Sequence, residues 1–97
     1  MAYLLIRQKF AEYTRWREAF DSLAQQRDAL GLETVAVTTN TSDPSEAVVL
    51  FRFDDIEQLR KHFPSPELKE AWRRGGVIEG SNQVTFLQEV VPPAETG

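Results

Sequence analysis

Four segments of the chain are dense in apolar, β-branched and aromatic residues, and each predicts a β-strand. They span residues 2–10, 32–41, 47–53 and 83–91. The turn-forming sequence Ser-Asp-Pro-Ser separates the second segment from the third, and two prolines end the fourth. We therefore expect four strands.

Two other segments carry apolar residues at steps of three and four, which is the spacing of an amphipathic helix. The first begins near Glu12 and can end at Gly31, and the second spans residues 55–74 with a break at residues 64–65. The apolar positions of the first are Tyr13, Trp16, Phe20, Leu23, Ala24 and Leu30; those of the second are Ile56, Leu59, Phe63, Leu68, Ala71 and Trp72.

The order of these elements is β-α-β-β-α-β, which is typical of the ferredoxin-like arrangement. We expect an α+β fold in which a four-stranded antiparallel sheet carries both helices on one face. In this interpretation residues 1–91 form a single domain and residues 92–97 form a flexible C-terminal tail.

The strand segments do not alternate between apolar and polar residues, as a sheet with one face in water should. Residues 3–6, Tyr-Leu-Leu-Ile, and residues 47–51, Ala-Val-Val-Leu-Phe, are continuous apolar runs. An uncovered apolar sheet face would be larger than the apolar patches of soluble monomers. We therefore expect a homodimer packed sheet against sheet; the alternative is a monomer.

Composition limits the classes of partner. The 97 residues include 11 Lys and Arg against 15 Asp and Glu, and the net charge of −4 argues against nucleic acid or a membrane as partner. The absence of cysteine excludes a disulfide framework and a thiolate metal site. The apolar run at residues 3–6 is too short for a signal peptide, and no run approaches a membrane span. We expect a soluble, cytoplasmic protein.

Three carboxylates, Asp54, Asp55 and Glu57, crowd the start of the second helical segment and could bind a metal ion. A helix N-terminus also attracts capping carboxylates, and no further ligand stands at a suitable spacing. We favour capping and expect no metal. Ser65 is likewise suited to cap the restarted helix, and Gly75-Gly76 to end it rather than to cradle a phosphate.

His62 and Trp72 are the candidate functional residues of the second helical segment. His62 is the only histidine of the chain, and a group of this type titrates near neutral pH, which suits a general acid or base. Its alternative is an ordinary histidine at the edge of the buried face. Trp16 and Trp72 lie on apolar stripes, so each is either a core anchor or an aromatic surface for a ligand.

A row of side chains on the strands is the main candidate for a ligand site. If the more apolar rows, with Val35 and Val37, face the helices, the opposite rows line the space between two sheets. Arg7, Arg52 and Asn40 could there bind an anionic or enolic ligand, because a guanidinium group forms bidentate contacts. They could instead sit at strand ends, reach water or pair with carboxylates of the interface. The row consists of Tyr3, Arg7, Ala36, Thr38, Asn40 and Arg52.

Several short motifs resemble those of small proteins in the dimeric α/β-barrel superfamily, typified by the antibiotic biosynthesis monooxygenases. The resemblance covers residues 2–90 and implies a sheet-to-sheet homodimer, with a pocket between sheet and helices or toward the barrel interior. Activities in that superfamily include cofactor-independent oxygenation, haem degradation, cyclisation, isomerisation and peroxidase chemistry. The motifs are Tyr13-x-x-Trp16-x-x-x-Phe20-Asp21, Asp43-Pro44, Phe53-Asp54-Asp55, and Ser65-Pro66-Glu67-Leu68 with Ala71 and Gly75-Gly76-Val77.

The functional residues of the superfamily carry over only by type. Haem-degrading members use an Asn on the first strand and a Trp followed by a His, whereas here the first strand offers Arg7, and His62 precedes Trp72. The resemblance therefore does not extend to haem degradation. Cofactor-free oxygenases use Asn, Trp, Tyr and Arg in a polar pocket, and residues of those types occur here as Asn40, Trp72, Tyr3 and Arg7 or Arg52.

These observations give one leading functional hypothesis and one alternative. The leading hypothesis is a dimeric α/β-barrel protein that handles a small aromatic or anionic organic molecule, as a cofactor-independent monooxygenase, cyclase or isomerase. Arg7 or Arg52 would stabilise an enolate-like charge, and His62 would act as acid or base, with no cofactor. The alternative is a non-catalytic dimeric ligand-binding or scaffold module.

Overall fold

All four predicted strands are present, and each predicted helical segment is divided into two short helices. The computed structural model describes residues 2–63 and 65–90, so the tail predicted at residues 92–97 lies outside the described residues. In chain order the elements are β1 (Ala2–Lys9), α1 (Tyr13–Ser22), α2 (Ala24–Ala29), β2 (Glu33–Asn40), β3 (Asp43–Phe53), α3 (Ile56–His62), α4 (Pro66–Arg74) and β4 (Gln83–Gln88).

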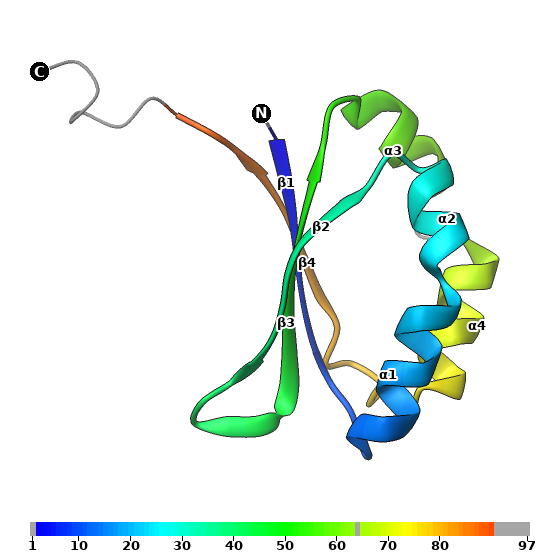
Figure 1. Cartoon of the computed structure of the whole chain (residues 1–97), viewed down its shortest axis with the longest axis vertical. Helices are drawn as coiled ribbons and strands as arrows, with labels where there is room; N and C mark the ends of the chain where they lie inside the picture. Colours follow the sequence, from blue (N-terminus) through cyan, green and yellow to red (C-terminus); the bar gives the residue numbers. More distant parts are fainter. Residues whose placement is uncertain (1, 64, 91–97) are drawn as a thin grey trace, which may run out of the picture.

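The strands form one antiparallel sheet in the order β2-β3-β1-β4. The two central strands, β1 and β3, pair along their whole common length, from Ala2 opposite Phe53 to Lys9 opposite Glu46. All the helices lie on one side of the sheet, and no element of the described chain covers the other side (Figure 1). The predicted ferredoxin-like α+β fold is thus confirmed.

The first helical segment is not the single helix that its periodicity predicts. The helix breaks at Leu23, whose N–H donates to the Phe20 carbonyl three residues earlier, a tighter turn than the α-helix makes. A break of one residue hardly changes the spacing of the apolar positions, and Leu23 itself remains buried. The hydrophobic pattern therefore could not reveal the break.

Two details of β2 and β3 also differ from expectation. Val35 does not face the helices as predicted: the register shifts between Thr34 and Ala36, and Val35 is 46% exposed. A β-bulge inserts one residue that has no partner, which ends the strict alternation on which that prediction rested. Strand β3 begins at Asp43 rather than Ala47, and its proline, Pro44, falls at a second register shift, where it has no partner on β2.

Along β1 and β3, buried side chains alternate with half-exposed ones. The hydrophobic core lies between the helices and the buried row of each strand. A column of stacked rings crosses this core from Phe10 through Trp16 and Phe20 to Phe51, with centroid separations of 5.6, 5.4 and 6.3 Å. The column joins the loop after β1, helix α1 and strand β3.

Among the helices of the described residues, none combines the length and the apolar content that crossing a membrane requires.

The predicted helix caps are confirmed. The Asp55 carboxylate accepts hydrogen bonds from the Glu57 and Gln58 N–H groups, and the Ser65 hydroxyl accepts one from the Leu68 N–H. At the end of α4, Gly75 allows α1 to approach closely, since a Cβ there would lie 2.9 Å from the Ala19 Cβ. Gly75 has φ −74°, so only this packing, and not the backbone conformation, requires glycine.

Substitution Gly75→Ala should destabilise the protein by about 1–3 kcal/mol, because the added methyl group overpacks the contact between α1 and α4. Urea denaturation of the two proteins would measure the difference. Ala19→Gly should cost less stability in the Gly75→Ala background than in the native protein, because there it also removes the opposing methyl group. If Gly75→Ala leaves the denaturation midpoint unchanged, the close approach of these helices is wrong.

Candidate functional site

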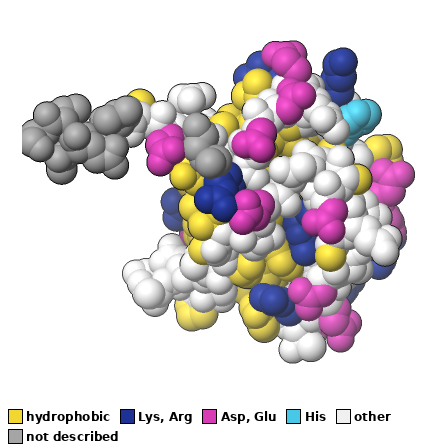
Figure 2. Space-filling view, turned by 45° about the horizontal axis from the view of Figure 1, so that its top comes forward, with side chains coloured by type: hydrophobic (Ala, Val, Ile, Leu, Met, Phe, Trp, Pro, Cys, Tyr) yellow, Lys and Arg dark blue, Asp and Glu magenta, His cyan; other side chains and the backbone are white. Residues whose placement is uncertain are grey.

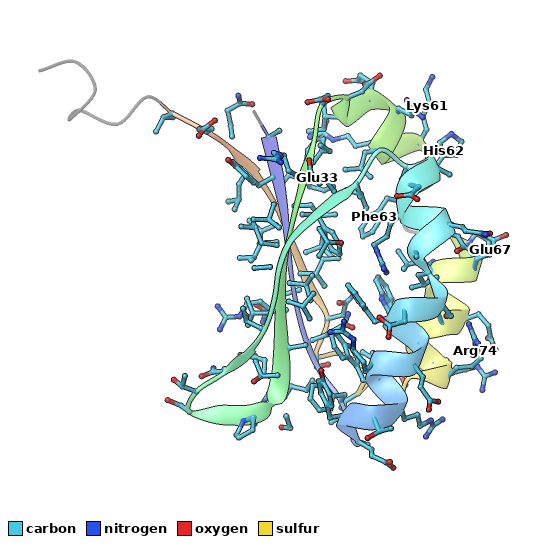
Figure 3. The ribbon with its side chains drawn as sticks, viewed as in Figure 1. Glu33, Lys61, His62, Phe63, Glu67 and Arg74 are labelled. Carbon is cyan, nitrogen blue, oxygen red and sulfur yellow. The ribbon has the colours of Figure 1, made fainter. Side chains whose placement is uncertain are left out.

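A narrow cavity of about 40 Å³, which we call the slot, lies between the helical layer and the sheet. Wider hollows lie elsewhere, among them one of about 360 Å³ beside Phe53, Arg60 and Phe86. Figure 3 shows Phe63 on the inner side of the helical layer, facing the slot. The lining of the slot consists of Ile6, Gln8, Trp16, Phe20, Leu23, Arg27, Leu30, Leu32, Val49, Phe51, Phe63, Leu68 and Trp72.

Gln8 provides a fixed polar group at the cavity. It occupies the inner row of β1, where its neighbours are apolar, and it is only 4% exposed. Its Oε1 accepts from Trp16 Nε1 at 2.7 Å, and its Nε2 donates to Asn82 Oδ1 at 2.9 Å. These two bonds join β1, helix α1 and the segment before β4, and they fix the orientation of the Trp16 ring.

Arg27 is the charged side chain of the cavity lining. Helix α2 places its guanidinium carbon 4.0 Å from the centroid of the Phe20 ring, and Nη1 donates to the Phe20 carbonyl at 2.6 Å. Burial lowers the pKa of Arg27, because removal from water disfavours the charged form.

The predicted strand residues lie on the other side of the sheet, which we call the open face. Its central members are Tyr3, Leu5, Arg7, Val48, Leu50 and Arg52, flanked by Ala36 and Thr38 on β2. At one end of the open face, Arg7 and Asn40 both donate to Glu46 Oε1, at 3.1 and 3.0 Å. Hydrogen bonds from Asn40 and then from Arg7 lower the pKa of the Glu46 carboxyl.

Arg52 lies apart from this cluster, toward the other end of the open face. Arg52 forms an ion pair with Glu33 at 2.7 Å. Thr38, another predicted residue, donates its hydroxyl hydrogen to the Val48 carbonyl at 2.6 Å. The structure thus brings Arg7 and Asn40 together through Glu46 but places Arg52 elsewhere. Both arginines pair with carboxylates of the same chain.

The two candidates from the helical segment lie on the helical side of the sheet. Trp72 lines the cavity, so the sheet separates it from Tyr3, Arg7 and Arg52. His62 is exposed in a shallow outer hollow with Gln58 and Glu67 and does not line the cavity; Figure 3 shows it on the outer side of the helical layer. The roles assigned to these residues stay predictions.

Sequence reasoning missed Gln8 and Arg27. Gln8 left a signal, because it is a polar residue in the same alternating row as Leu4 and Ile6. Arg27 left none, since arginine on an amphipathic helix is ordinarily exposed and the break at Leu23 was not foreseen.

Within residues 2–63 and 65–90, no three His, Asp or Glu side chains gather where they could hold a metal ion.

Substitution Gln8→Leu should lower the free energy of unfolding by about 1–3 kcal/mol, because it leaves the buried Trp16 N–H without an acceptor. Adding Trp16→Phe to Gln8→Leu should cost less than Trp16→Phe costs in the native protein, since no donor is then left unpaired. Urea denaturation of the four proteins measures this coupling. Additive effects would show that the Gln8–Trp16 bond does not contribute.

Comparison with models of known protein families finds no match to this chain, and no curated protein sequence matches it significantly. Solved structures do match over nearly the whole chain. A candidate antibiotic biosynthesis monooxygenase from Caulobacter crescentus CB15 has a TM-score of 0.72 at 19% identity, covering 93% of this chain and 90% of its own. Another from Deinococcus radiodurans has a TM-score of 0.70 at 14% identity, with 95% of both chains covered.

A conserved protein from Methanosarcina mazei Go1 is similar to the same degree, with a TM-score of 0.71 at 13% identity and 92% of both chains covered. At identities this low, likeness shows the fold alone. The expected resemblance is confirmed at that level: this chain has the fold of small proteins named as antibiotic biosynthesis monooxygenases.

Proposed function

We propose that this protein forms a homodimer through its open face and binds a small, flat aromatic molecule in the cavity between helices and sheet. The observation that carries the proposal is the lining of the cavity, in which five aromatic rings surround a slot with two polar side chains, Gln8 and Arg27. Ligand sites in proteins are typically apolar and aromatic, with a few placed polar groups that fix orientation.

The shape of the cavity favours a flat ligand. The slot holds only about 40 Å³, so any ligand ring has to move lining side chains apart as it enters. A flat ring needs the smallest displacement, and its stacking against Trp16 or Trp72 would add to the gain from burying apolar area.

The open face supports the homodimer. Tyr3, Leu5, Val48 and Leu50 lie there half-exposed, and Leu87 on the adjacent strand β4 is 40% exposed. Figure 2 shows hydrophobic side chains at the surface on the sheet side and most acidic side chains over the helices. A second copy of the same face would remove these apolar side chains from water and would leave its ion pairs near the rim.

The names of the structural neighbours favour oxygenation of the bound molecule as the activity. Neither polar side chain of the described lining exchanges a proton readily near neutral pH, because glutamine does not titrate and arginine stays protonated. Oxygenation would therefore start from a ligand that itself loses a proton easily. A non-catalytic binding module is the alternative, and both hypotheses use the same cavity.

Binding can be tested with a neutral probe, 2-naphthamide, because both tryptophans of the chain line the cavity. We expect both indole N–H signals in a two-dimensional NMR spectrum to shift in a saturable way during titration. Leu30→Phe, which adds volume to the lining, should weaken the response by roughly tenfold, whereas Ala24→Leu on the outer surface of α2 should not. Absence of any saturable shift would contradict the proposed binding function.

The homodimer can be tested by light scattering at micromolar concentration. We expect twice the 11.1 kDa mass of the single chain. Leu50→Glu should give the single-chain mass with an unchanged circular dichroism spectrum, because it places a charge at the centre of the open face. Ala24→Glu, with the same added charge on α2, should remain dimeric. A monomeric native protein would contradict this part of the proposal.

A further inference from the structure

Arg27 gives the cavity a chemical preference that its apolar lining alone would not have. Arg27 belongs to the lining of the slot, and its guanidinium carbon lies 4.0 Å from the centroid of the Phe20 ring. A ligand ring bound in the slot would therefore have Arg27 beside it as a partner for a polar substituent. Such a contact between the substituent and Arg27 requires that the cavity binds a ligand, as proposed above.

Most N–H donors of the Arg27 guanidinium group have no acceptor within the described chain. A guanidinium group carries five N–H donors, and the described chain provides one acceptor, the Phe20 carbonyl at 2.6 Å. Within residues 2–63 and 65–90 no carboxylate lies within 4.0 Å of Arg27. A charge partly removed from water without a counter-ion is unfavourable, and a ligand anion would relieve this cost.

We propose that the ligand is an aromatic monocarboxylate whose ring fills the cavity and whose carboxylate binds Arg27. The planar guanidinium group matches a carboxylate by two parallel N–H···O bonds, and it remains charged at every pH at which the protein is folded. Trp16 cannot bind the anion in its place, because its N–H already donates to Gln8.

The surrounding charges favour one negative charge over two. Burial lowers the pKa of Arg27, the charges of Asp21 and Asp28 oppose this shift, and the charge of Arg17 adds to it. Arg17 lies over the same Phe20 ring at 5.6 Å but is paired with Asp21 at 3.2 Å. Arg27 is thus the one cation of the described cavity lining, and two nearby carboxylates would repel a dianion such as a phosphate monoester.

The test compares 2-naphthoate with 2-naphthamide, which have the same shape and differ in charge. Both are titrated into the native protein while the two indole signals are followed by NMR. We expect naphthoate to bind at least roughly tenfold more tightly, which is the usual effect of a charge-assisted pair of hydrogen bonds. Arg27→Gln should bring the affinities for the two probes to about the same value, and Arg27→Lys should retain part of the preference.

Arg17→Gln is the matched control, because it removes the same charge beside the same ring but outside the cavity. It should keep the preference for naphthoate. Equal affinity for the two probes, or a preference that survives Arg27→Gln, would overturn the carboxylate proposal while the binding function stands. If neither probe binds the native protein, the binding function fails and this proposal fails with it.

Discussion

The helical layer packs on the sheet through the column of stacked rings that runs from Phe10 through Trp16 and Phe20 to Phe51. Three of these rings, Trp16, Phe20 and Phe51, also line the slot. Core packing and the candidate binding site are therefore two consequences of one arrangement of aromatic residues.

Single-sided coverage of the sheet divides the strand side chains into two regions. The inner rows of β1 and β3 are committed to the core and the cavity, while the outer rows, with Leu5 and Leu50 at their centre, remain half-exposed. A partner copy and a small ligand would thus use opposite sides of the same strands. Because neighbouring residues on a strand point to opposite sides, a change at one position affects one region and spares the other.

The sequence was sufficient to predict the order of the strands along the chain, the sheet with its helices on one face, and the caps at Asp55 and Ser65. These features follow from local periodicity and from residue types that favour helix ends. It was not sufficient to predict the break at Leu23 or the bulge at Val35, because each depends on tertiary packing. The inward row of β1 was assigned correctly, but the buried Gln8 within it was overlooked.

Site residues were harder to predict than the fold, since residue type alone does not say which partner is near. Arg7 and Arg52 were predicted to bind a ligand because both are arginines on strands, yet each forms an ion pair with a glutamate of the same chain. Arg27, which looked like an ordinary helix-surface residue, lines the cavity. The distinction depends on where α2 lies relative to the sheet, and that position is set by the whole fold.

A crystal structure of the protein grown with 2-naphthoate tests the central claim most directly. The account predicts the naphthalene ring in the slot beside Trp16 and Trp72, with both carboxylate oxygens within hydrogen-bond distance of the Arg27 guanidinium group. Ligand density on the open face beside Arg7 or Arg52, with the slot filled by protein side chains, would contradict it.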